Sequence, residues 1–203
     1  MHAVFVWLVT GEDGRWRPGI GDPTFVGWLT VVAYVAAAGF AFRAFLASRG
    51  AARRAGLPAD AADARALARL WLLVTAVMLL LGLNKQLDVQ TLFTQVARDM
   101  ALAQGWYEER RKYQLAFIVA ILAAGAVGTG ALAFALRRVL GRVVGAVVGL
   151  GLIASFVVVR AASFHHVDIL LGTGPVRLNW VLELGGIAAI AVSASRGAAH
   201  APR

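Results

Sequence analysis

The chain contains no cysteine and only two lysines among its 203 residues. The absence of cysteine excludes disulfides, thiolate-bound metals, iron–sulfur clusters and thiol redox catalysis. Strands of about ten residues with alternating polarity, which are typical of membrane β-barrels, are also missing. The sequence likewise lacks a His-Glu-x-x-His motif, a Gly-x-Ser-x-Gly motif and a glycine-rich phosphate loop after a strand. The common soluble enzyme classes that depend on these features are therefore excluded.

Long apolar runs dominate what the chain does contain. Hydrophobic residues make up 60% of it, and its mean hydropathy is +0.71, above the level of soluble domains. Because the backbone must satisfy its own hydrogen bonds in lipid, runs of this length predict helices. We predict an all-α integral membrane protein forming one domain, residues 1–203. Its five transmembrane helices are expected at about 25–46, 67–87, 115–136, 143–171 and 176–195, the fourth extending beyond the bilayer at its outer end.

The segment 88–104, between the second and third spans, has a different pattern. Leu92, Val96 and Met100 recur at helical spacing, while Gln95 and Asp99 belong to a polar face. This pattern predicts an amphipathic helix lying at the membrane interface, and Gly105 is expected to end it.

The net charge of +9 is distributed unevenly between the two sides of this topology. The side that holds the segments 43–69 and 137–142 and the C-terminus carries eleven arginines and two aspartates, whereas the other side has nine basic and nine acidic residues. The positive-inside rule then places the N-terminus outside and the C-terminus inside. This arrangement explains the basic composition without a nucleic-acid partner. The arginine-rich face either sets the orientation alone or also contacts anionic lipids.

Small residues at four-residue spacing predict close helix packing. Gly141, Gly145 and Gly149 share one face of the fourth span, and Ala124 and Gly128 offer a similar face on the third. Because the link between these spans is short, we expect them to form a tight antiparallel hairpin. A homodimer interface is the alternative use of this face.

Polar residues gather on the predicted outer side. Glu183 lies inside an apolar run, where a carboxylate costs a few kcal/mol unless it is paired, and Lys85 and Arg160 are its expected partners. The predicted outer pocket comprises Lys85, Asp88, Arg111, Arg160, His165, His166, Asp168, Asn179 and Glu183.

These residue types suggest three roles. Lys85, Asp88, Arg111, Arg160 and Asn179 are candidates for ligand binding, with the cations suited to phosphate or carboxylate. His165, Glu183 and Asp168 are candidates for acid–base catalysis. His165, His166 and Asp168 could also hold a divalent metal, although adjacent histidines on a helix diverge by about 100° and rarely bind one ion together. Haem is not expected, because the remaining two histidines lie near the termini.

The sequence leaves the activity open. The first hypothesis is a multi-pass protein of the bacterial inner (cytoplasmic) membrane whose outer pocket binds or processes a lipid head group or another amphiphile; arginine outnumbering lysine favours a GC-rich bacterium. The alternative is a non-enzymatic accessory subunit of a membrane complex, in which the polar residues are structural. A proton path through Glu183 ranks last, because no polar route continues toward the inner side. Membrane lipids, a second copy or a complex subunit are the expected partners.

Overall fold

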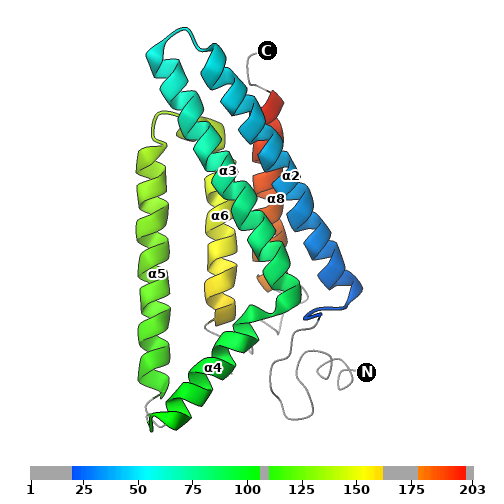
Figure 1. The fold of residues 1–203 in the computed structure, drawn as a ribbon, viewed down its shortest axis with the longest axis vertical. Coiled ribbons are helices and arrows are strands. Elements are labelled where there is room, and N and C mark those ends of the chain that lie inside the picture. The colour runs from blue at the N-terminus through cyan, green and yellow to red at the C-terminus, as the bar shows by residue number, and fades with distance from the viewer. Residues whose placement is uncertain (1–19, 106–109, 162–177, 200–203) are drawn as a thin grey trace.

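The computed structural model describes residues 20–105, 110–161 and 178–199, and all regular structure within these residues is helical (Figure 1). The helices are α2 (Phe25–Arg54), α3 (Pro58–Leu87), α4 (Val89–Ala103), α5 (Arg110–Ala135), α6 (Leu140–Ala161) and α8 (Leu178–Ala199).

Four of these helices are long and apolar enough to cross a bilayer: α2, α3, residues Leu140–Val158 of α6 and residues Trp180–Ala199 of α8. Large apolar side chains such as Val32, Leu80 and Val148 are exposed on their outer faces, which suits lipid rather than water. The chain is therefore described as a multi-pass membrane protein. In α5 the apolar segment Val119–Ala135 is shorter, so the fifth crossing stays a prediction.

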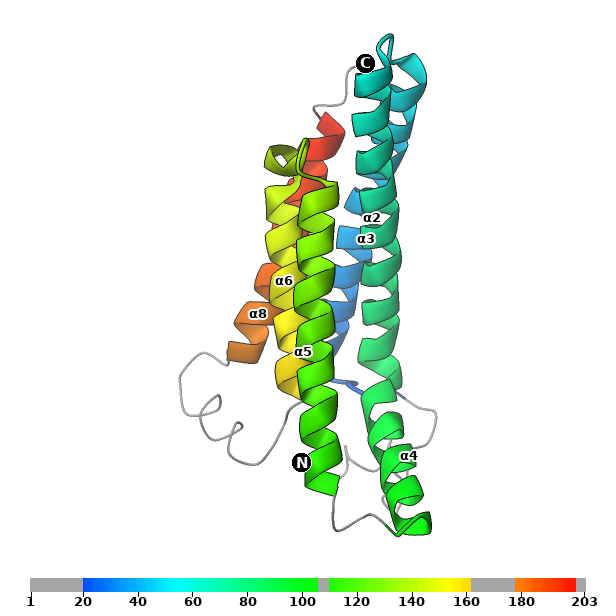
Figure 2. The ribbon, with the colours of Figure 1, turned by 90° about the vertical axis from the view of Figure 1, so that its left-hand side faces the viewer.

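The bundle is built from two helix pairs. α2 and α3 form one antiparallel hairpin, α6 packs along α8, and contact between α2 and α8 joins the pairs (Figures 1 and 2). The core where they meet includes the buried side chains of Tyr34, Trp71, Met78, Val143 and Ile190. α5 lies beside α6, and most of its described side chains are exposed. α2 and α8 thus form the centre of the bundle, with α3 and α6 as flanking walls.

The α2–α3 hairpin extends further than the predicted spans 25–46 and 67–87. α2 continues to Arg54, and α3 begins at Pro58, so that only residues 55–57 link them. Proline at the first helical position has a backbone angle already suited to a helix, and the alanines and arginines that follow are good helix formers. At about 1.5 Å per residue, each 30-residue helix is roughly 45 Å long, which matches a bilayer including its head-group regions.

The third and fourth predicted spans, α5 and α6, are joined by a short link and lie side by side as expected, but the glycines of α6 do not pack tightly against α5. The small residues of α6 face α8 instead: a Cβ atom added at Gly149 would lie 2.7 Å from the carbonyl oxygen of Gly186, and one at Gly145 would lie 3.2 Å from the Cβ of Ser193. A Cβ at Gly128 of α5 meets nothing within 4 Å. α8 supplies the matching small surface, so Gly145 and Gly149 serve packing inside the chain.

α4 follows α3 after a break at one residue. Asp88 has φ 44°, a left-handed backbone conformation that aspartate tolerates better than most residues. At the other end, Gly105 has φ 75°, which confirms that this glycine ends the amphipathic helix. Val96, Met100 and Leu102 of α4 are exposed. Its location at the membrane interface remains a prediction.

Candidate functional site

The structure brings together three of the predicted pocket residues. The side chains of Lys85, Asp88 and Glu183 line one small cavity at the end of the bundle where α4 begins. Arg111, Arg160 and Asn179 belong to α5, α6 and α8, but their side chains are outside the described part of the structure. The residues His165, His166 and Asp168, which include the whole proposed metal set, also lie outside the described residues. Among the residues that are described, no three histidines or carboxylates are placed to hold a metal ion.

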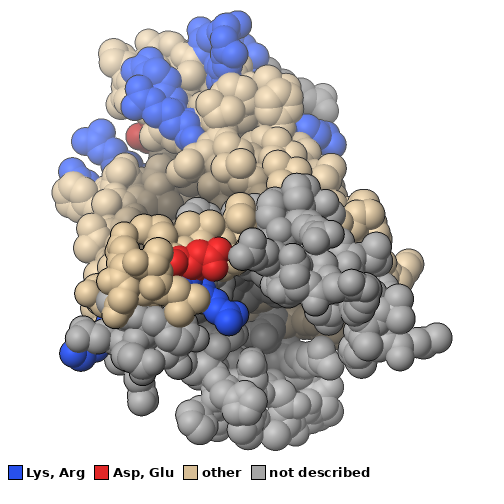
Figure 3. Space-filling view, turned by 60° about the horizontal axis from the view of Figure 1, so that its bottom comes forward, with Lys and Arg blue, Asp and Glu red and all other residues tan. Residues whose placement is uncertain are grey.

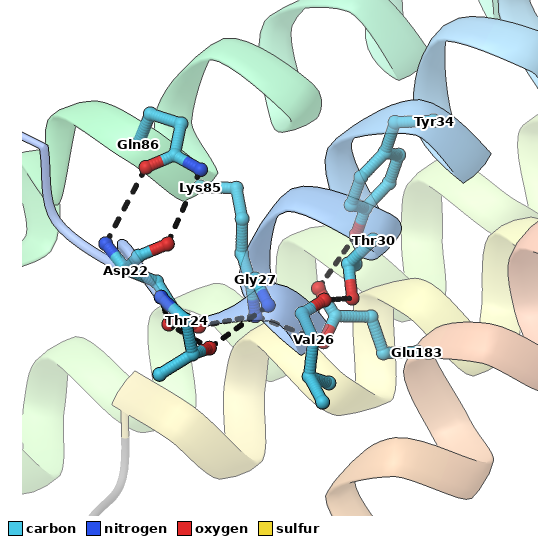
Figure 4. Close-up of polar contacts among 9 residues, drawn as sticks. All are labelled: Asp22, Thr24, Val26, Gly27, Thr30, Tyr34, Lys85, Gln86 and Glu183. Carbon is cyan, nitrogen blue, oxygen red and sulfur yellow. Dashed lines mark hydrogen bonds and ion pairs between the residues drawn. The ribbon is translucent and has the colours of Figure 1, made fainter.

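A buried ion pair forms the centre of this site (Figure 4). The ammonium nitrogen of Lys85 lies 3.3 Å from Oε2 of Glu183, which confirms Lys85 as a partner of this carboxylate. The hydroxyl of Tyr34 donates a hydrogen bond of 3.2 Å to Oε1. Glu183 is only 3% exposed, so both carboxylate oxygens depend on partners within the protein. α2, α3 and α8 are thereby joined through one carboxylate.

Close helix packing places Tyr34 at this position. A Cβ atom at Gly82 would lie 3.1 Å from the Cβ of Tyr34, so glycine lets the tyrosine of α2 pack against α3. Lys85 follows three residues later on the same face of α3. Sequence reasoning missed Tyr34, although a tyrosine inside a long apolar span is a recognisable signal: its hydroxyl needs a partner when buried.

A second carboxylate approaches Lys85 from the segment before α2. Oδ2 of Asp22 lies 3.9 Å from the lysine nitrogen. The side chain of Gln86 holds the backbone of Asp22: its amide nitrogen donates to the carbonyl oxygen at 3.3 Å, and its oxygen accepts from the N–H at 3.4 Å. Sequence reasoning missed Asp22 and Gln86 as a pair, because they are 64 residues apart.

The start of α2 fixes the orientation of Asp22. Oδ1 of Asp22 accepts a 2.6 Å hydrogen bond from the hydroxyl of Thr24. Thr24 is the N-cap of α2, and its oxygen accepts a 3.0 Å hydrogen bond from the N–H of Gly27. The helix cap and the ion pair of Lys85 and Glu183 are therefore connected through Asp22, which accepts a hydrogen bond from Thr24 and lies near Lys85 (Figure 4).

The cavity beside the ion pair has a volume of about 60 Å³. This space holds a few water molecules or one small polar group, but not a complete lipid head group. Figure 3 brings this end of the molecule forward, and few of the described residues that it shows there are charged. Among the described side chains, the ammonium group of Lys85 lies near the carboxylates of Asp22 and Glu183, and Asp88 also lines the cavity. The cavity is lined by Tyr34, Leu81, Asn84, Lys85, Asp88, Phe156, Val157 and Glu183.

No family model, curated protein or solved structure matches this chain.

Proposed function

We propose that this chain is a multi-pass protein of a bacterial cytoplasmic membrane, with α5 as a fifth crossing, the N-terminus outside and the C-terminus inside. The arginines near the α2–α3 and α5–α6 links support this orientation, because they lie at the end of the bundle opposite to Lys85 and Glu183. In this orientation the ion-pair site faces the outer leaflet.

We further propose that the ion-pair site binds the polar head of a lipid or another amphiphile. The observation that carries this proposal is the Lys85–Glu183 pair at the edge of a cavity. A buried ion pair contributes little net stability compared with apolar side chains of similar volume. Charged residues inside a membrane bundle therefore favour a functional role.

The geometry also indicates which part of a head group would enter. Lys85 is already paired with Glu183 and lies near Asp22, which reduces its capacity to bind a phosphate alone. The two carboxylates of Asp22 and Glu183 beside Lys85 favour a group that is cationic or donates hydrogen bonds, such as an amine or a hydroxyl. Arg111 and Arg160 remain the proposed contacts for a phosphate, and His165 and Asp168 the proposed additional acid–base groups.

Native mass spectrometry of protein extracted gently from its own membrane tests this proposal. We expect a defined lipid or amphiphile adduct on the wild type, at least tenfold less abundant in Glu183→Gln. The matched control is Asp99→Asn, which neutralises an exposed carboxylate of α4 outside the cavity. Equal adducts on all three proteins would contradict the proposal, provided that size-exclusion chromatography shows each to be folded.

An accessory subunit is the second candidate function. The exposure of α5 favours it: Gly125, Gly128 and Gly130 have open space where a Cβ would point, and small residues allow a neighbouring helix to approach closely. A stoichiometric protein partner in the same mass spectra, without a lipid adduct, would favour this candidate.

The absence of cysteine makes the proposed orientation easy to test. A single cysteine introduced by Gln104→Cys, after α4, should react with a membrane-impermeant maleimide in intact spheroplasts. Leu57→Cys, in the α2–α3 link, should react only after the membrane is permeabilised. The reverse pattern would contradict the orientation.

A further inference from the structure

A second and much larger cavity lies at the opposite end of the bundle. Its volume is about 800 Å³, and it is bounded by the same four helices, α2, α3, α6 and α8. Arg54, Arg142 and Arg196 contribute to its lining from three of these helices. None of these residues belongs to the ion-pair site, so this cavity is a separate feature of the molecule.

This second cavity, which we call the arginine cavity after Arg54, Arg142 and Arg196, has a charged rim and an apolar floor. The three arginines are exposed, whereas Trp71 and Val143 are each only 1% exposed. Asp60 and Asp63 of α3 also line the cavity, and they balance two of the three positive charges in the lining.

The wider surroundings of the cavity are strongly basic. The last turns of α2 and the α5–α6 link, which lie at the same end of the bundle, carry further arginines, and the described residues of these two segments include no acidic residue. These additional arginines are Arg49, Arg53, Arg137 and Arg138. The local field therefore attracts anions, while the apolar floor accommodates a nonpolar group.

Close packing of α8 shapes the floor. A Cβ atom at Gly197 would lie 3.3 Å from Cζ2 of Trp71, so the glycine allows the indole ring to lie flush against α8. Along α3, the separation between Ala64 in this cavity and Lys85 in the other is 21 residues, or roughly 31 Å of helix. This distance equals the thickness of the hydrocarbon core, about 30 Å. The arginine cavity thus lies at the level of lipid phosphates when Lys85 lies at the opposite boundary.

We propose that the arginine cavity is a binding site for a phosphate-bearing anion, held by Arg54, Arg142 and Arg196 above the apolar floor at Trp71. Guanidinium groups form paired hydrogen bonds with phosphate oxygens, which a single lysine cannot reproduce. Either the head group of an anionic phospholipid or a free phosphate compound would supply this chemistry. The site is independent of the ion-pair site and does not rest on the proposed function.

Quenching of Trp71 fluorescence by brominated lipids tests the proposal on the full chain in detergent. The probes are phosphatidylglycerol and phosphatidylcholine with brominated acyl chains, and the Trp71→Phe protein isolates the signal of this indole among the six tryptophans. Glycerol phosphate, added as a competitor, represents the free phosphate source. We expect phosphatidylglycerol to quench at about tenfold lower concentration than phosphatidylcholine.

Two charge variants separate a defined site from a general surface effect. Arg142→Gln with Arg196→Gln should weaken the interaction at least about tenfold, since each substitution removes charge-assisted, paired hydrogen bonds to the phosphate. Arg138→Gln, which removes an arginine outside the cavity, should change it less than twofold. Equal weakening by Arg138→Gln would overturn the proposal, because only the summed surface charge would then matter.

A third variant tests the cavity itself. Ala51→Phe narrows it without changing any charge and should reduce quenching by phosphatidylglycerol at least fivefold. Displacement of the brominated lipid by millimolar glycerol phosphate would identify a free phosphate compound as the ligand, and resistance to it would identify the lipid. If neither probe binds in a manner that depends on Arg142 and Arg196, the proposal is overturned. Size-exclusion chromatography and thermal unfolding of each variant exclude misfolding as the cause.

Discussion

The same four helices form both ends of the bundle, but a charged side chain is buried at one end, whereas the arginine side chains are exposed at the other. At the α4 end, Glu183 is buried and its charge is matched inside the protein by Lys85, with a cavity of only about 60 Å³. At the other end, exposed arginines surround a cavity of about 800 Å³. A buried carboxylate requires an internal partner, whereas exposed guanidinium groups can be satisfied by water or lipid phosphates. We call the α4 end, with its small cavity, the closed end, and the opposite end, with its large cavity, the open end. Burial of the charged side chains, and not their number, distinguishes the two ends.

The middle of the bundle keeps the two ends apart. Val74, Met78, Ile153 and Ile190 are buried between them. The hydroxyl of Thr75, a buried polar group in this region, donates to the carbonyl oxygen of Trp71 in its own helix. The described core thus offers no continuous polar route between the cavities, which argues against a proton path through Glu183.

Removing the buried carboxylate should have the largest effect on stability. Glu183→Ala leaves Lys85 partly buried without its main partner, and breaking such a pair costs about 3–5 kcal/mol. Reversible unfolding in mixed micelles measures this loss. The double variant Lys85→Met, Glu183→Leu should regain most of it, because an apolar pair of similar volume removes the desolvation cost. A double variant as unstable as Glu183→Ala would show that the charges themselves hold this end together.

Separating α6 from α8 should lower the stability of the whole bundle, because both helices line both cavities. A Cβ at Gly149 would lie 2.7 Å from a backbone oxygen of α8, so Gly149→Ala should destabilise the protein by about 1–3 kcal/mol. Gly151→Ala is the matched control on the same helix, since a Cβ there meets nothing within 4 Å. The same unfolding assay compares them. Equal stability of the two variants would refute the close approach of these helices.

Loss of one hydroxyl should weaken the closed end less. Tyr34→Phe keeps the ring but removes the hydrogen bond to Glu183, and a hydrogen bond to a charged group contributes about 1.5–3 kcal/mol. We expect a loss near the lower value, because Lys85 still pairs with the carboxylate. The effect should disappear when Tyr34→Phe is introduced into the Lys85→Met, Glu183→Leu background. A loss that persists there would assign the contribution of Tyr34 to packing.

A charge variant at the open end should have the smallest effect on stability. Arg142→Gln should change the free energy of unfolding by no more than about 0.5 kcal/mol, because the side chain is exposed. Its binding of phosphatidylglycerol should nevertheless decrease. A loss of stability comparable to that of Tyr34→Phe would indicate that Arg142 contributes to folding through a contact within the protein.

The positions of the helices and one contact of the ion-pair site can be predicted from the sequence. Apolar runs predicted helices α2, α3, α6 and α8. The isolated Glu183 in such a run predicted a pairing with Lys85 or Arg160, and the structure shows the pairing with Lys85. Asp22 and Gln86 could not be paired in advance, because their contact depends on how the segment before α2 meets the end of α3. Small-residue spacing identified a packing face on α6 but not its partner, since several helices carry similar faces.

The backbone break at Asp88 connects the closed end to the surface of the molecule. This single residue ends α3, begins α4 and lines the small cavity. α4 has 15 residues and is about 22 Å long, and its direction depends on the backbone conformation of Asp88, which also lines the cavity. A rotation of about 10° at Asp88 would displace the far end of α4 by about 4 Å. The orientation of a whole amphipathic helix therefore depends on one residue of the cavity wall.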